Sequence, residues 1–315
     1  MNELEAGWTG ERLEPFVYSE NTNEHLHRYA MAMELAVGKK VLDIASGEGY
    51  GSALLAGLAD EVVGVDIAPE TILLASQRYK ADNLRFLTGA ADAIPWEDHY
   101  FDLVVSFETI EHHDRHEEMM RELRRVLKPG GLLLISSPDK RYYSDLPGYR
   151  NPFHVKELYQ HEFESLLSSH FAETSFLKQK SIYGSVVVPL KDENPSNDFI
   201  PAYKGDYAAI RSAEMEAVYL IGLASDAPLP KLKTSLFDGA AVLQKQFELL
   251  SRNVTDVVTA AVAARVTHEV TEKVSREVSE RVERETTKKM METRSYKIGN
   301  RLIRPFVALK KILHA

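Results

Sequence analysis

The sequence predicts an α/β fold, with a doubly wound, mainly parallel sheet of seven strands in residues 1–232 and a long α-helical coiled coil after it. Two observations lead to this prediction. In the first 232 residues, continuous apolar runs alternate with helix-like segments, as in parallel sheets covered by helices on both faces. From residue 240 to residue 292, glycine and proline are absent, and from Val254 to Val282 valine recurs every fourth residue, which is close to the helical period.

The individual elements of the sheet follow from the same alternation. We expect strands over residues 40–45, 61–66, 84–88, 101–107, 132–136, 173–178 and 217–224. Helices are expected between most of them, for example over residues 68–79, 116–127 and 155–169. Residues 129–131, Pro-Gly-Gly, are predicted to form a turn between a helix and the next strand. Residues 190–206 are too long and polar for an ordinary connection, and we expect a lid or a disordered loop there.

Composition narrows the class of protein. The chain has 315 residues with ordinary apolar content, and it has no cysteine, which excludes disulfides and thiolate metal sites. No apolar run approaches the ~20 residues that span a bilayer. The first residues are acidic without an apolar core, unlike a signal peptide, so we expect a cytoplasmic protein. The net charge of −9 disfavours a general nucleic-acid binder, and we expect no nucleic-acid partner.

Residues 236–292 are predicted to form one oligomerisation helix. The valine positions continue as Thr286 and Met290, and five acid-then-base pairs four residues apart line the rest: 269 with 273, 272 with 276, 277 with 281, 280 with 284 and 285 with 289. One narrow apolar seam cannot be buried by the helix alone, so we expect a homo-oligomeric coiled coil. The four-residue spacing favours right-handed winding, and β-branched seam residues favour a trimer. The alternative is a helix folded back on its own domain.

The tail, residues 293–315, contains six Lys or Arg residues and no acid, interleaved with apolar residues. This pattern is typical of a basic amphipathic segment on an anionic membrane surface, here the inner face of the cytoplasmic membrane. It is equally compatible with docking on a partner protein. A solvated, frayed end is the third interpretation.

A glycine-rich loop follows the first predicted strand. Glycines stand at positions 47, 49 and 51, where a side chain would fill the space of a ligand pressed against the backbone. The second strand ends in Asp66, about 20 residues on, where an acid accepts hydrogen bonds from ribose hydroxyls. An NAD-dependent dehydrogenase also fits these features, but the glycine spacing disfavours it, and Asp43 at the end of the first strand suits a cationic ligand.

Five segments together resemble a class I S-adenosylmethionine (SAM) methyltransferase: residues 41–51, 63–66, 89–93, 101–107 and 125–131. The resemblance covers about residues 20–225. It implies that the glycine loop holds the methionine part of SAM, Asp43 its amino-group region, Asp66 the ribose and Asp92 the adenine amine. It also implies that the cofactor contacts Ala45, Gly47, Gly49, Ile67, Ala91, Phe107 and Glu108. The alternative for Asp66 and Asp92 is that they cap the helices that follow.

Residues 108–114, Glu-Thr-Ile-Glu-His-His-Asp, follow the predicted strand 101–107, so their side chains are expected at the ligand crevice. Methyl transfer needs alignment of donor and acceptor and a base for the acceptor's proton, and His112 suits that role with Glu111 beside it. The pattern of Glu108, Glu111 and His112 is also similar to sites that bind a divalent ion, Mg²⁺ or Mn²⁺, in some SAM-dependent O-methyltransferases. His154 is a further candidate catalytic or ligating residue. In the alternative without metal, Glu108 only borders the cofactor.

The substrate class rests on resemblance. Residues 10–12, 24–29, 49–52, 106–112 and 151–157 are similar to methyltransferases of bacterial surface-polysaccharide synthesis, some of which cap an O-antigen glycan by methylating its terminal sugar. In some of these proteins a coiled coil sets the distance to a polymerase complex, so a glycosyltransferase or polymerase partner is implied. The alternatives are a small-molecule O-methyltransferase for a quinone precursor or nucleotide sugar, a non-catalytic SAM-binding scaffold and, less favoured, an RNA methyltransferase.

Aromatic residues are candidate platforms for the sugar ring. A glycan acceptor needs such rings and hydrogen-bonding side chains in an open cleft. The candidates are Tyr18, Tyr29, Trp96, Tyr142, Tyr143 and Tyr149. Each of them is also compatible with a place in the core or at the rim of the domain.

Overall fold

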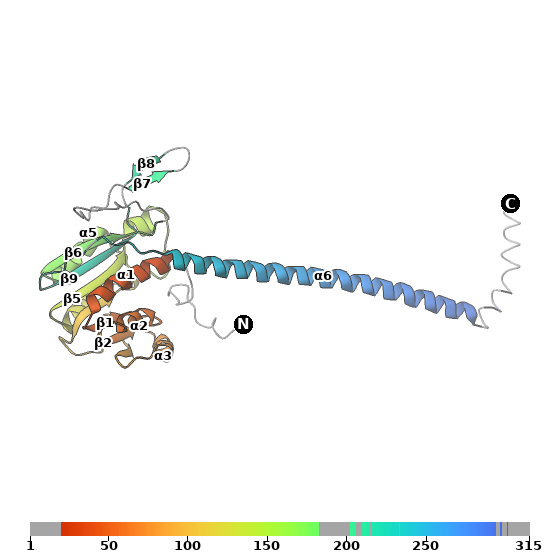
Figure 1. The fold of residues 1–315 in the computed structure, drawn as a ribbon, viewed down its shortest axis with the longest axis horizontal. Coiled ribbons are helices and arrows are strands. Elements are labelled where there is room, and N and C mark those ends of the chain that lie inside the picture. The colour runs from red at the N-terminus through yellow and green to blue at the C-terminus, as the bar shows by residue number, and fades with distance from the viewer. Residues whose placement is uncertain are drawn as a thin grey trace, which may run out of the picture. The chain divides into compact units, whose positions relative to one another are not determined.

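The computed structural model describes residues 20–182, 202–205, 210–213, 216–232, 234–293, 297 and 301. The chain divides into two compact units, Met1–Gln246 and Phe247–Ala315. The first unit contains the sheet, and the second contains most of one long helix (Figure 1).

A seven-stranded sheet forms the centre of the first unit, in the order β3-β2-β1-β4-β5-β9-β6 (Figure 1). The five strands β1 to β5 are parallel, whereas β9 is antiparallel to both β5 and β6. The prediction of a mainly parallel, seven-stranded sheet is therefore confirmed. The strands are β1 (Lys40–Ile44), β2 (Glu61–Asp66), β3 (Leu84–Thr88), β4 (Phe101–Ser106), β5 (Leu127–Pro138), β6 (Glu173–Gln179) and β9 (Tyr219–Ser225).

Helices cover both faces of this sheet. One apolar cluster joins strand residues such as Val41 to Ala32 of α1 and Leu55 of α2. The other joins strand residues such as Leu42 to helices α4 and α5. Neighbouring residues of β1 thus point to opposite layers, which is the doubly wound arrangement. The helices of this unit are α1 (Glu20–Ala36), α2 (Tyr50–Ala56), α3 (Pro69–Arg78), α4 (His116–Val126) and α5 (Gln160–His170).

Two predictions of local structure are wrong. The Pro-Gly-Gly segment lies inside β5, where the register against β4 jumps from the pair Phe101–Leu127 to the pair Leu103–Leu132. It is therefore a bulge within a strand, and Gly130 accommodates it with a positive φ of 74°. The helix expected over residues 155–169 begins only at Gln160, because the backbone N–H groups of residues 155 and 156 donate to the carbonyl of Glu111.

Short elements complete the described chain. They are a 3₁₀ turn, η1 (Ile110–His112), a π-helical turn, η2 (Arg141–Asp145), and a hairpin of β7 (Ala202–Gly205) and β8 (Ile210–Ala213). Most of the predicted lid over residues 190–206 lies outside the described residues, so the lid stays a prediction. Among the described residues, no helix has the length and apolar character to cross a bilayer.

Helix α6 (Ala240–Glu292) confirms the predicted long helix, with 53 residues. One predicted ion pair, between Glu280 and Arg284, is present. Other arginines reach the acid four residues after them, as in the pairs of Arg265 with Glu269 and Arg281 with Glu285. Most of the basic tail lies outside the described residues, and its role stays a prediction.

Candidate functional site

The glycine loop lies at the carboxyl end of β1, between β2 and β4. Its backbone uses left-handed conformations at Ala45, Gly47 and Gly49, with φ of 59°, 52° and 82°. Alanine rarely adopts a left-handed conformation, because this conformation costs about 1–2 kcal/mol for a residue with a Cβ. A side chain at Gly49 would collide with Phe86 and Ala75. The loop is thus a strained, compact turn of the kind that holds ligands.

Asp66 fastens this loop to the neighbouring strand. Its carboxylate accepts hydrogen bonds from the N–H of Gly47 at 2.9 Å and from the N–H of Ala68 at 3.0 Å. Ala68 is the N-cap residue of α3, so Asp66 also supports the start of that helix, as the capping alternative proposes. The next side chain, Ile67, is 70% exposed although it is apolar. An exposed apolar side chain beside a buried carboxylate suits a ligand with an aromatic base and a ribose.

Asp92 and Ala91 follow β3 at the same edge of the sheet. Asp92 forms an ion pair with Arg115 at 2.5 Å, which ties it to the segment before α4. Ala91 is half-buried and packs against the core. Both lie beyond the carboxyl end of a strand adjacent to β2, where the resemblance expects the adenine. That role stays a prediction.

Asp43 is buried beneath the glycine loop, with 1% of its surface exposed. It accepts hydrogen bonds from Ser52 Oγ at 2.6 Å and from the Tyr29 hydroxyl at 3.2 Å. Burial raises the pKa of Asp43 to about 7, and the two hydrogen bonds partly oppose that rise. Asp43 therefore joins β1 to α1 and α2. Tyr29 also makes an edge contact with Phe107, so Phe107 is packed from the α1 side.

Glu108 follows β4 in a left-handed conformation, with φ of 50°. Ser136 holds it twice, since the hydroxyl accepts from the Glu108 N–H and donates to its carboxylate at 2.7 Å. The same carboxylate oxygen lies 3.2 Å from the guanidinium of Arg28, a residue that is 1% exposed. Arg28 donates through Nε to Gln179 at 2.7 Å and lies over the ring of Tyr219. Sequence reasoning missed Gln179 and Ser136, which have no motif around them.

Glu111, His112 and His154 form the second part of the site. One ligand atom from each lies within 4.8 Å of the others, a spacing that a metal ion could bridge. Glu111 is buried, and neither of its carboxylate oxygens has a hydrogen-bond partner among the described residues. Burial, and secondly the charge of Glu108, raise the pKa of Glu111 well above its ordinary value. The predicted metal-binding set of Glu108, Glu111 and His112 therefore differs from the observed cluster. Glu108 contacts Arg28 and Ser136 instead, and His154 takes its place.

His154 is held from both sides of its ring. Nδ1 lies 2.6 Å from a carboxylate oxygen of Glu157, and Nε2 lies 2.9 Å from the side-chain nitrogen of Asn151. A proton on Nδ1, donated to Glu157, leaves Nε2 as the acceptor. Tyr143 stacks on the imidazole, with ring centroids 5.1 Å apart. Sequence reasoning missed Glu157 as a partner. Its position three residues after His154 is a signal that could have identified it.

His112 lies beside His154, and its ring is oriented in the same way, with Nδ1 as the donor. Nδ1 lies 3.2 Å from the carbonyl of Phe153, to which it can donate a proton. Nε2 lies 4.0 Å from Glu111, so its lone pair faces the buried carboxylate. The rings of His112 and His154 meet edge to face at 5.1 Å. The site therefore combines two oriented imidazoles and one buried carboxylate near the carboxyl end of β4, and Nε2 of His154 is already occupied by the side-chain nitrogen of Asn151.

Comparisons with known proteins agree with this geometry. Residues 42–135 match the family model described as "Methyltransferase domain". A probable SAM-dependent methyltransferase of Mycolicibacterium smegmatis is 36% identical over 51% of this chain and 63% of its own length. A second one, from Mycobacterium tuberculosis, is 34% identical over 50% of this chain and 58% of its own length. The chain spans less than two thirds of the length of these relatives.

Among solved structures, the YcgJ protein of Bacillus subtilis is similar over 50% of this chain and 71% of its own, with 25% identity and a TM-score of 0.44. The names of the two mycobacterial relatives specify the methyl donor and not the acceptor. Residues 42–135, which match the methyltransferase model, contain β2 to β4 and parts of β1 and β5. Together with β6 and β9 these strands form the seven-stranded, Rossmann-like sheet, and the match and the sheet agree with a class I SAM-dependent methyltransferase domain.

Proposed function

We propose that the protein is a SAM-dependent O-methyltransferase that acts on a sugar hydroxyl of a bacterial surface glycan of the O-antigen type and caps its chain terminus. One observation carries the proposal of catalysis. Glu111 and His112 follow β4, the strand next to the one that bears the glycine loop, and His154 lies close to both of them. The buried carboxylate of Glu111 has no hydrogen-bond partner among the described residues. A scaffold that only bound SAM would have no need for this arrangement. The choice of acceptor is supported by the sequence resemblance.

The residues of the site suit an in-line displacement. SAM supplies an electrophilic methyl group on a positively charged sulfur. His112 is the base, because donation from Nδ1 to the carbonyl of Phe153 makes Nε2 the nitrogen that accepts the proton of the acceptor hydroxyl. The oxygen then bonds to the methyl carbon while the carbon–sulfur bond breaks, and its electron pair stays on sulfur. Glu111 lies 4.0 Å from the same Nε2 and stabilises the imidazolium that forms. A placed base typically contributes ~10²–10⁴-fold.

The partners and location remain part of this proposal. The protein works in the cytoplasm, at the inner face of the membrane. There the basic tail contacts anionic lipid or a glycosyltransferase of the polymerase complex. Residues 293–315 contain six Lys or Arg residues and no Asp or Glu, and this charge supports the assignment.

A divalent ion fits the same residues. Glu111, whose carboxylate oxygens have no hydrogen-bond partner among the described residues, and the imidazole of His112 offer one carboxylate and one nitrogen ligand. His154 offers a second nitrogen once Asn151 releases its Nε2, and this set suits Mn²⁺ better than Mg²⁺. When bound, the ion would lower the pKa of the acceptor hydroxyl. The test is to measure activity and, separately, Mn²⁺ binding by electron paramagnetic resonance after chelation. Full activity in the chelated protein and no Mn²⁺ binding would remove the metal from the proposal.

The acceptor is tested with isotope-labelled SAM. The protein is incubated with labelled donor and, in parallel, with surface polysaccharide, nucleotide sugars and quinone precursors. We expect the label in polysaccharide, and its loss in His112→Ala. Label found only in a small molecule would contradict the glycan proposal but support methyl transfer, and binding of SAM without any transfer would indicate the scaffold instead.

A further inference from the structure

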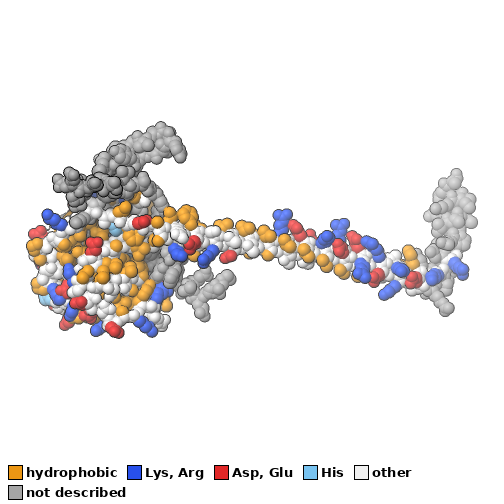
Figure 2. Space-filling view, in the orientation of Figure 1, with side chains coloured by type: hydrophobic (Ala, Val, Ile, Leu, Met, Phe, Trp, Pro, Cys, Tyr) orange, Lys and Arg blue, Asp and Glu red, His pale blue; other side chains and the backbone are white. Residues whose placement is uncertain are grey.

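Helix α6 carries a stripe of eight valines that no described residue covers. From Val254 to Val282, at every fourth position, their exposed fractions lie between 51% and 62%. The space-filling view shows hydrophobic side chains along the helix in the same way (Figure 2). The unit that contains these valines cannot bury them against itself, because among its described residues there is only this helix. A second chain that packs along the helix would bury them.

The spacing of the stripe fixes the hand of that contact. Four residues advance an α-helix by about 400°, so each valine is displaced by about 40° around the axis from the one before it. The stripe therefore winds in the right-handed sense, opposite to a heptad seam. Helices that keep such stripes in contact along their length wind around each other in the same sense, and each helix must supply a stripe. A second copy of α6 supplies an identical one.

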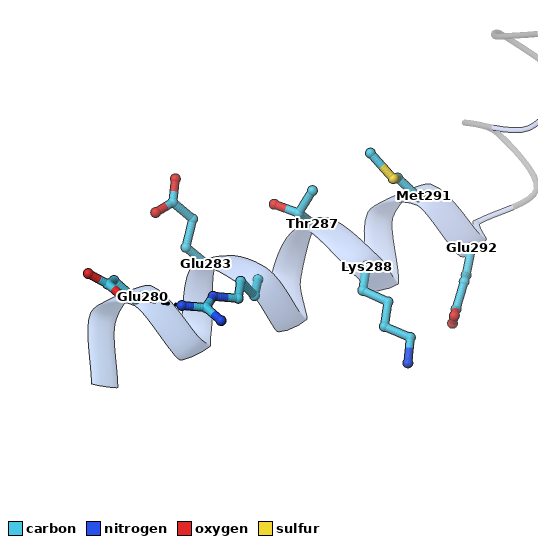
Figure 3. Close-up of a pocket in the computed structure, with 7 residues that line it drawn as sticks. Glu280, Glu283, Thr287, Lys288, Met291 and Glu292 are labelled. Atoms are coloured by element: carbon cyan, nitrogen blue, oxygen red, sulfur yellow. Dashed lines mark hydrogen bonds and ion pairs between the residues drawn. The ribbon is translucent and has the colours of Figure 1, made fainter. Parts of the chain in front are cut away.

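The charges of α6 are unevenly distributed along its length. Residues 240–264 contain four charged side chains, whereas residues 265–292 contain seven Lys or Arg and seven Glu. Figure 3 shows part of the second half, where Glu283 and Lys288 project from the helix and a dashed line marks the pair of Glu280 with Arg284. These side chains border a depression that the described chain leaves open to solvent.

This distribution determines the orientation of the copies. In an antiparallel pair, the charged half of one helix would lie over the alanine- and valine-rich half of the other, and its charges would lose water without gaining partners. In a parallel pair without offset, balanced charges face balanced charges and the apolar halves face each other. We infer that α6 mediates self-association of this protein as a parallel, in-register, right-handed assembly. β-branched residues throughout the seam favour three copies.

The absence of cysteine makes orientation directly measurable. In full-length Val254→Cys, oxidation should cross-link copies through the same position. An antiparallel arrangement centred on the stripe would separate these thiols by about 42 Å, the length of 28 helical residues, and would cross-link Val254→Cys chains only to Val282→Cys chains. Asp256→Cys is the matched control, because it lies on the opposite side of the helix at almost the same height. Cross-linking only between positions 254 and 282 overturns the inference.

The native mass of the protein tests whether the valine stripe holds the copies together. The full-length protein should have a native mass that is a multiple of 35.5 kDa, and Val266→Lys with Val274→Lys should reduce it to one chain. His268→Lys, on the other side of the helix, should leave the mass unchanged. Circular dichroism of each variant separates loss of association from loss of helix. A wild-type mass of one chain, or an unchanged mass in the double lysine variant, refutes the assignment.

Discussion

Valine has opposite environments in the two units of this protein. In the sheet, Val41, Val62, Val63, Val104 and Val105 are fully buried. In α6, the valines of the stripe are all more than half exposed. The residue type is the same, and its surroundings differ because a strand between two helical layers buries both of its faces, whereas an isolated helix buries none.

This difference shows what each unit needs in order to be stable. Burial contributes roughly 25 cal/mol per Å² of apolar surface, and the sheet obtains it within one chain. In the proposed assembly, the stripe of α6 obtains it from a second copy. We therefore expect changes in the sheet to affect folding and changes in the stripe to affect association.

The largest expected effect contrasts Val104→Asp with Val270→Asp. Val104 is in the centre of the sheet, and an unpaired carboxylate there costs several kcal/mol, enough to prevent folding. Val270 lies on the exposed stripe, so Val270→Asp should leave the thermal unfolding of the sheet unit unchanged and weaken association. Scanning calorimetry measures the first effect and sedimentation the second. Equal losses of thermal stability in both variants would contradict the comparison.

Burial in the sheet unit also changes the pKa of a charged group, Asp43. Its pKa in the folded protein is about 7, above the ordinary value of 3.8, so its contribution to stability is complete below about pH 4 and is lost as the pH rises through 7. The loss is about 4 kcal/mol at most, at 1.36 kcal/mol per pKa unit. Denaturant unfolding of wild type and Asp43→Asn should therefore diverge between pH 4 and pH 7. A difference between the two proteins that does not depend on pH would show that Asp43 ionises normally.

Asp66→Ala should weaken SAM binding by roughly 10- to 100-fold. The variant removes the carboxylate proposed for the ribose and also releases the N–H of Gly47, so the loop loses its anchor. Asp60→Ala is the matched control, since Asp60 is exposed just before the same strand. Equilibrium dialysis with labelled SAM gives both affinities. Equal affinities in the two variants would remove Asp66 from the site.

The smallest effect contrasts two His–Glu pairs. His154 and Glu157 have largely buried side chains that lie 2.6 Å apart, whereas the side chains of His268 and Glu272 in α6 are exposed and 3.8 Å apart. Glu157→Gln should lower kcat about tenfold, because the His154 tautomer is no longer fixed, and it should also shift the pH profile of kcat. Glu272→Gln should change neither, since exposed pairs contribute little. An unchanged pH profile in Glu157→Gln would assign Glu157 a structural role only.

Much of the fold could be predicted, because continuous apolar strands and a four-residue valine period are local signals. The strand bounds over residues 61–66 and 84–88 agree with the structure residue for residue. The bulge in β5 was not predictable, because Pro-Gly-Gly indicates a turn in isolation and only pairing with β4 continues the strand. The late start of α5 has the same cause, a backbone contact with the distant Glu111.

Site residues that belong to one short sequence motif could be predicted. Those that come together only in the folded chain were missed. His112 and Glu111 belong to one short segment, and their position after β4 follows from the sheet. The contacts of Arg28 with Glu108, and of Arg28 with Gln179, join residues 80 or more positions apart in the chain. No local pattern specifies such pairs, so the absence of Glu108 from the metal-compatible cluster could not be predicted, whereas His154 was already a candidate ligand from the sequence.

The central claim is that the crevice at the carboxyl ends of β1, β2 and β4 binds SAM. Isothermal titration calorimetry of the full-length protein with SAM, and with its demethylated product, tests this most directly. We expect one binding site per chain for each. No heat of binding with either nucleoside, over a range of temperatures and with a protein that circular dichroism shows to be folded, would contradict the claim.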